Sequence, residues 1–216
     1  MITKGKLATV LLAFFSIASW VKASTLVEFD TPYLFAELVA GKVNGYYGSS
    51  LPEVDGRPST SCEFFFTSDF VNPANPNRNS IKTYYTDSTF NKRARDDVLT
   101  AELLVSGERW TLQMDQVPYG CLSAAGGGFL KGSAISNDVK NRVAFIGIFV
   151  VNKKTYFFEN KQNRFFKQKA FLVPGNTVIA FKKSGDFYFV RYLNTLTSVV
   201  TQGWVPIDST SNPFPQ

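Results

Sequence analysis

Histidine is absent from the 216-residue chain, and this absence excludes most common catalytic sites. A serine or cysteine nucleophile usually needs a neighbouring imidazole to take its proton. Zinc sites also draw on His and on Cys thiolates, and the chain has two Cys. The sequence therefore predicts neither a hydrolase of the Ser-His or Cys-His type nor a zinc enzyme, and we expect no metal and no cofactor.

Other chemical motifs are missing as well. Gly126-Gly127-Gly128 lies outside any GxxxxGK[ST] or GxGxxG pattern, so it does not predict a phosphate-binding loop. No D-x-[DN]-x-[DN]-G calcium loop is present. A glycosidase needs only two carboxylates, and the candidates are Glu63, Asp87, Asp96, Asp97, Glu102, Glu108 and Asp115. Because they are scattered through short strands and polar turns, we expect surface charge and a protein that is not an enzyme.

Long apolar runs are also missing after residue 23, so no later segment can span a bilayer. Residues 1–23 fit a secretory signal peptide, with Lys4 and Lys6 before an apolar core at 7–19 and Ala23 at its end. We expect cleavage after Ala23, a periplasmic or secreted protein, and no stable membrane insertion of the mature chain.

The positive charge is modest once the signal is removed. The formal charge of +6 falls to +3, because Lys4, Lys6 and Lys22 leave with residues 1–23. This surplus does not indicate nucleic-acid binding, and no nucleic acid is expected as a partner. Positive side chains do gather locally, at Lys161, Arg164, Lys167 and Lys169, then at Lys182 and Lys183. The cluster is either a solvated loop face or a contact surface for an acidic partner or anionic glycan.

Two cysteines in an exported chain predict one disulfide between Cys62 and Cys121, with two free structural thiols as the alternative. The bond closes a loop of about sixty residues, which corresponds to a stabilisation on the order of 4 kcal/mol. It would link the N-terminal half of the chain to itself.

Hydrophobic alternation predicts a β-rich N-terminal domain over residues 24–151. Trp110, Leu112 and Met114 alternate with polar residues, as expected of a half-buried strand. Further strands are expected at 61–68, 81–86, 98–105 and 143–151. The last is a continuous apolar run and predicts a single buried strand that links the two halves. Residues 29–39 predict a short helix, because helix formers follow a Pro there.

Residues 117–132 (VPYGCLSAAGGGFLKG) predict a loop that Cys121 ties down at one end. The loop is either a structural turn that packs Phe129 into the core or an exposed binding loop. In the second case the candidate contact residues are Leu122, Gly126, Gly127, Gly128, Phe129 and Lys131.

The C-terminal part, residues 152–210, predicts a small β-barrel. The sequence predicts, in order, an aromatic strand at 154–159, a long polar loop at 160–169, a Pro-Gly-Asn turn at 174–176 and strands at 177–181, 187–193 and 201–206. The sequence predicts a frayed tail over residues 208–216. Residues 211–216 of this tail lie outside the predicted domain.

This order resembles the bacterial SH3 (SH3b) family over about residues 153–208. The resemblance is carried by Tyr156-Phe157-Phe158, Val173-Pro174-Gly175-Asn176, Val190-Arg191-Tyr192 and the closing Gly203-Trp204-Val205. It implies a small barrel that binds peptides, cell-wall fragments or other proteins. Groove aromatics of such a barrel would be Tyr156, Tyr188, Tyr192 and Trp204, with core packing as the alternative. The whole chain is then mainly β, a disulfide-stapled N-terminal β-rich domain followed by an SH3-like barrel.

Two functions are compatible with these expectations. The first is a periplasmic inhibitor or immunity protein that binds and blocks a cell-wall hydrolase or toxin effector. Export, the missing catalytic residues, the stapled domain and the Gly-rich loop favour it, because a rigid loop loses little entropy on binding. The second is recognition of peptidoglycan or a peptide through the SH3b barrel, which rests on the resemblance alone.

Overall fold

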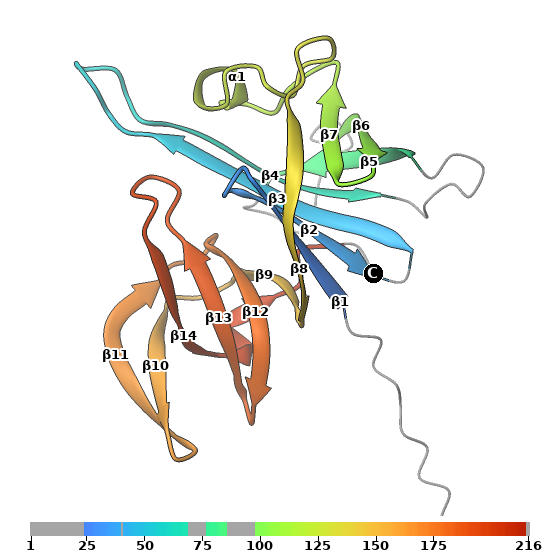
Figure 1. Ribbon diagram of the computed structural model, residues 1–216. Helices are drawn as coiled ribbons and strands as arrows, with labels where there is room; N and C mark the ends of the chain where they lie inside the picture. Colours follow the sequence, from blue (N-terminus) through green and yellow to red (C-terminus); the bar gives the residue numbers. More distant parts are fainter. Residues whose placement is uncertain (1–23, 40, 69–76, 86–97, 215–216) are drawn as a thin grey trace, which may run out of the picture.

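The computed structural model describes residues 24–39, 41–68, 77–85 and 98–214, so the predicted signal peptide lies outside the described residues (Figure 1). The described chain is mainly β, as predicted. It forms a closed eight-stranded barrel, here called the first barrel, and a curled seven-stranded sheet, here called the second sheet. The N-terminal part is thus the closed barrel, and the C-terminal part, which the resemblance led us to expect as a barrel, is an open sheet.

The first barrel is an antiparallel meander in which each strand pairs with the next and the last returns to the first. Its strands are β1 (Ser24–Phe29), β2 (Leu34–Val39), β3 (Lys42–Leu51), β4 (Thr60–Ser68), β5 (Arg78–Tyr84), β6 (Leu99–Ser106), β7 (Arg109–Met114) and β8 (Ser136–Phe145). A one-turn helix, α1 (Cys121–Ala124), lies between β7 and β8. The predicted alternation of Trp110, Leu112 and Met114 is confirmed, since all three are buried in the barrel interior.

The second sheet has the order β11-β10-β14-β13-β12-β9-β15. Its strands are β9 (Gly147–Val151), β10 (Thr155–Lys161), β11 (Arg164–Leu172), β12 (Thr177–Ser184), β13 (Phe187–Leu193), β14 (Val200–Pro206) and β15 (Thr210–Ser211), with a 3-10 turn at Ile207–Ser209. Phe157, Val178, Val190 and Val205 form its own apolar core.

The two sheets share a third apolar cluster. Phe64 and Phe66 on β4 belong to the barrel interior, whereas Phe65 between them belongs to the shared cluster. Ile148, Ile179 and Phe214 join that cluster from the C-terminal part of the chain. Successive side chains of a strand point to opposite faces, so the outer face of β4 is covered by the second sheet.

This two-sided burial explains two predictions that are wrong. Residues 29–39 contain the strand β2, not a helix: Leu34 and Ala36 face the barrel interior and Phe35 faces the shared cluster. The run 143–151 is not a single strand. It breaks at Ile146 into β8, which pairs with β1 and β7, and β9, which pairs with β12 and β15. A strand buried on both faces loses the apolar-polar alternation that identifies it.

Two polar segments also differ from their predictions. Residues 160–169 are not a loop, because β10 and β11 form a hairpin whose two-residue turn, Gln162-Asn163, has φ values of 51° and 63°. Both faces of β11 are largely exposed, so charged and polar residues alternate irregularly with Phe along the strand and no strand pattern stands out in its sequence. Residues 208–214 are not frayed, because β15 pairs with β9 and Phe214 is buried.

Candidate functional site

A row of five residues crosses the second sheet. The strand register makes Lys167, Phe158, Trp204, Phe189 and Lys182 successive cross-strand partners on β11, β10, β14, β13 and β12. Directly opposed residues of neighbouring strands place their side chains on one face. Three aromatic side chains therefore lie side by side with a lysine at each end of the row.

Two more rings extend this row. Phe165 of β11 stacks on Phe187 of β13, with ring centres 3.9 Å apart and an angle of 10° between the planes. Phe187 meets Phe158 edge-on at 5.2 Å, and Phe165 meets Trp204 at 5.6 Å. All five rings are half-buried. The aromatic patch, as we call it, consists of Phe158, Phe165, Phe187, Phe189 and Trp204.

The local sequence explains why these rings face outward. Gly203 and Val205 on β14 are buried on the core side, so Trp204 between them points to the other face. A side chain at Gly203 would place its Cβ 2.9 Å from the Phe157 ring, so glycine is needed there for β14 to lie against the core. In β13, Phe187 and Phe189 likewise alternate with Tyr188 and the buried Val190.

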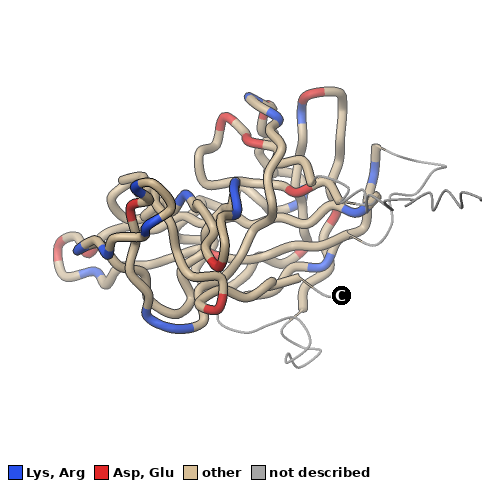
Figure 2. The backbone as a smooth tube through the Cα atoms, turned by 90° about the horizontal axis from the view of Figure 1, so that it is seen from below, with Lys and Arg blue, Asp and Glu red and all other residues tan. Residues whose placement is uncertain are grey.

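Positive charge predominates in the part of the chain that carries the aromatic patch. Residues 147–216 carry nine Lys and Arg against three Asp and Glu, a formal charge of +6, whereas residues 24–146 carry eleven against fourteen. Figure 2 shows the placement of these residues along the backbone. Of the predicted basic face, Lys161 pairs with Glu159 at 3.1 Å and the Lys167 ammonium lies 3.5 Å from the centre of the Tyr156 ring. Arg164 and Lys169 are exposed on β11.

The four aromatic residues predicted for a groove are not brought together. Trp204 lies in the aromatic patch, but Tyr188 and Tyr192 pack against the core of the second sheet, and Tyr188 stacks on Phe149 at 5.1 Å. Tyr156 lies beside Phe171 at 6.0 Å. The four phenylalanines of the aromatic patch were missed, although the alternation of Phe187 and Phe189 with Tyr188 was a signal that could have found two of them.

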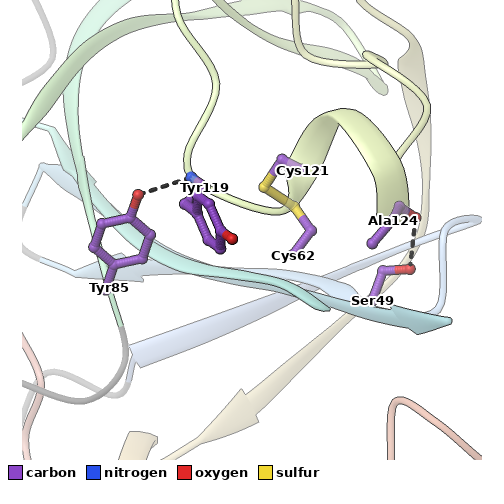
Figure 3. Close-up of a disulfide and its surroundings, with 6 residues drawn as sticks. All are labelled: Ser49, Cys62, Tyr85, Tyr119, Cys121 and Ala124. Atoms are coloured by element: carbon purple, nitrogen blue, oxygen red, sulfur yellow. Dashed lines mark hydrogen bonds between the residues drawn. A yellow bond between two sulfur atoms is a disulfide. The ribbon is translucent and has the colours of Figure 1, made fainter. Parts of the chain in front are cut away.

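A second candidate surface lies beside the disulfide, whose surroundings are drawn in Figure 3. The bond between Cys62 and Cys121 is present, as predicted. Next to it lies a groove of about 850 Å³, lined by the start of β4 and by the segment that precedes α1. The backbone N–H of Tyr119 donates to the Tyr85 hydroxyl at 2.7 Å, and the Ser49 hydroxyl donates to the carbonyl of Ala124 at 3.2 Å.

The predicted binding loop is partly buried and partly exposed. Phe129 is 5% exposed and lies edge-on to Tyr47 at 4.7 Å and to Phe64 at 5.3 Å. The structural-turn alternative is therefore confirmed for Phe129, and an exposed role for it is wrong. Gly127 and Gly128 are buried as well, while Leu122, Gly126 and Lys131 are exposed.

The described candidate carboxylates lie in two different environments. Burial raises the pKa of Glu63, whose carboxylate accepts a bond from the Thr195 hydroxyl at 3.4 Å. Glu102, Glu108 and Asp115 lie on the barrel surface, and Asp87, Asp96 and Asp97 lie outside the described residues. In the part of the chain that the structure describes, no three Cys, Asp or Glu side chains are grouped so that they could share a metal ion. No helix in those same ranges has the length and apolar character to cross a membrane.

Comparison with known proteins gives no relative for this chain. It matches no family model, no curated protein and no solved structure. The resemblance to SH3b domains therefore rests on its sequence motifs alone.

Proposed function

We propose that this is an exported, non-enzymatic binding protein that recognises an acidic segment of a protein partner through the aromatic patch. The observation that carries this proposal is the row Lys167-Phe158-Trp204-Phe189-Lys182 across the second sheet. Large aromatic side chains grouped at a surface mark interaction sites, and they are enriched at protein interfaces.

The geometry of the row suits an extended chain. Five neighbouring strands span at most about 19 Å at roughly 4.8 Å per strand, which is the length of about six extended residues. The stacked pair Phe165 and Phe187 holds the rings in place before a partner arrives, so few rotamers are lost on binding. Lysines at both ends favour carboxylates on the partner and disfavour basic chains.

A hairpin arm on the first barrel favours the inhibitor hypothesis for this partner. The β3–β4 connection extends beyond the barrel as an arm in Figure 1. Its tip, Val54 to Arg57, is closed by two backbone hydrogen bonds of 3.3 and 3.0 Å, and Leu51 and Val54 are exposed on it. A protruding, hydrogen-bonded hairpin is suited to enter a cleft. We therefore propose a cell-wall hydrolase or toxin effector as the partner that the protein blocks.

A pull-down tests this proposal. The mature chain from Ser24 is used as bait for periplasmic extract, and purified sacculi are offered in parallel. The charge reversals Lys167→Glu and Lys182→Glu are compared with Lys140→Glu, which makes the same change on the first barrel. We expect a stoichiometric protein partner that both row variants lose and Lys140→Glu keeps, and a fall in the partner's hydrolase activity on binding.

Two other outcomes would redirect the proposal. Sacculus binding without any protein partner would instead favour peptidoglycan recognition. A protein partner retained by both row variants would show that the aromatic patch is not the contact surface.

A further inference from the structure

We propose that the groove beside the Cys62–Cys121 disulfide binds an uncharged oligosaccharide. This site lies on the first barrel, is separate from the aromatic patch and does not depend on the function proposed for that patch. Its volume of about 850 Å³ falls in the range of roughly 300–1,000 Å³ typical of small-molecule sites. It is an open groove rather than an enclosed cavity, so a chain of sugars can extend beyond it.

Hydroxyl groups dominate the polar lining. They come from Ser59, Thr60, Ser61, Ser123, Tyr85 and Tyr119. Hydroxyls both donate and accept hydrogen bonds, which matches the mixed donors and acceptors of a sugar. Pro58, Val117, Pro118 and Leu122 supply apolar surface between them.

The charge of the lining excludes an anionic ligand as the preferred one. Glu63 is the single charged residue among the groove residues, and Lys and Arg are not among them. An anion would therefore find no cation to pair with and would be repelled by the carboxylate. The aromatic patch with its terminal lysines has the opposite preference, so the two surfaces select different partners.

Tyr119 provides a flat apolar surface at the groove. Its side chain is 90% exposed, the most exposed of the large apolar and aromatic side chains that the structure describes. An aromatic face carries partial negative charge, and the C–H groups on one face of a pyranose ring carry partial positive charge, so the two stack well. Exposed rings of this kind, flanked by hydroxyls, are suited to a sugar.

The backbone of Tyr119 is fixed before a ligand arrives. Its N–H is bonded to the Tyr85 hydroxyl, and Cys121 two residues later is joined to β4. Gly120 has φ 81°, and a Cβ there would lie 2.0 Å from the carbonyl oxygen of Ser61. Only glycine allows this close approach. The groove is thus preorganised, which lowers the entropic cost of binding.

Titration calorimetry on the mature chain tests the proposal, with the uncharged tetramer of N-acetylglucosamine as the probe. We expect saturable binding that Tyr119→Ala weakens by about tenfold or more, as removal of a central aromatic contact does. Tyr119→Phe should keep most of the affinity, because it keeps the ring. Phe166→Ala, which removes an exposed ring from the second sheet, is the matched control and should bind like the wild type.

Three results would overturn the proposal. They are no binding of the tetramer up to about 10 mM, equal binding by Tyr119→Ala, and tighter binding of the anionic galacturonic acid tetramer than of the uncharged one. Thermal unfolding of Tyr119→Ala should match the wild type, because the exposed side chain contributes little to stability. A loss of affinity with unchanged unfolding temperature therefore reports on the groove itself. The row variants of the aromatic patch should bind the tetramer normally, which separates this proposal from the preceding one.

Discussion

Arg191 on β13 forms an ion pair with Glu28 on β1 and so joins the second sheet to the first barrel. The two side chains are only 21% and 19% exposed. The guanidinium also lies over Phe35, 5.4 Å from the ring centre, and over Phe181 at 5.2 Å. The Arg191 side chain thus makes an ion pair and two cation–π contacts at the junction of the second sheet and the first barrel.

Arg191→Ala should lower the free energy of unfolding by about 2–3 kcal/mol, because Glu28 loses its ion-pair partner in a largely buried place and keeps the hydrogen bond from the Asn141 amide. Arg109→Ala is the control, since Arg109 pairs with Asp138 at 3.0 Å but both are well exposed. Such surface pairs contribute about 0–1 kcal/mol. Urea unfolding measures the free energy of unfolding of both variants. Equal losses would mean that the Arg191–Glu28 pair contributes no more than an exposed surface pair.

The disulfide should account for a large share of the stability. It joins residues 59 positions apart, and the chain-entropy estimate for a loop of this length is about 4 kcal/mol. The double variant Cys62→Ala/Cys121→Ala should lose roughly this amount in urea unfolding, and dithiothreitol should affect the wild type but not the variant. Unchanged stability in the variant would show that packing of Phe129 and its neighbours holds the loop without the bond.

Glu37 should make stability fall as the pH rises. The side chain is buried, and this burial raises the pKa of its carboxyl, although bonds from Ser24 and Asn44 oppose the rise. The folded state therefore binds the proton more tightly than the unfolded state, and stability is lost as the pH rises from about 4.3 through the raised folded value.

Glu37→Gln removes this titration. The stability of the Gln variant minus that of the wild type should therefore grow as the pH rises through that window and then level off. Urea unfolding at a series of pH values measures the difference, with Glu53→Gln on the exposed arm as the matched control. A difference that is flat with pH would contradict the expectation.

Phe214 should be important for stability although it lies near the end of the chain. It is 6% exposed and packs edge-on against Phe65 at 5.7 Å, and the Tyr84 hydroxyl donates to the carbonyl of Pro213 at 3.0 Å. Phe214→Ala should cost about 3 kcal/mol in thermal or chemical unfolding. Phe166→Ala, at an exposed position, should cost little. A negligible loss at Phe214 would restore the prediction of a frayed tail.

Local sequence patterns predicted the β class, the disulfide and the strands that have one buried and one solvent-exposed face. Trp110, Leu112 and Met114 alternate because one side of β7 is the barrel core and the other faces water. The pattern failed where both sides are buried. Phe35 looks like part of a helix in sequence, because the second sheet covers the outer face of β2, and that contact comes from residues more than a hundred positions away.

The candidate sites were harder to predict for the same reason. The aromatic patch depends on the register of five strands, including irregularities between Tyr156 and Phe158 and between Ala180 and Lys182. No single segment of sequence contains that register. Likewise, Tyr119 becomes part of a groove because the disulfide, its bond to Tyr85 and the contact of Gly120 with Ser61 hold its segment at the start of β4.

The apolar cluster between the sheets makes the molecule one cooperative unit. Leu26, Phe35, Tyr46 and Phe65 are covered by Ile148, Ile179 and Phe214, so a fragment ending at residue 146 would expose that face to water. The second sheet alone would lose the same contact. Neither part should therefore fold independently: the chain should melt in a single transition, and transplanting the second sheet into another protein would require redesign of Ile148, Ile179 and Phe214.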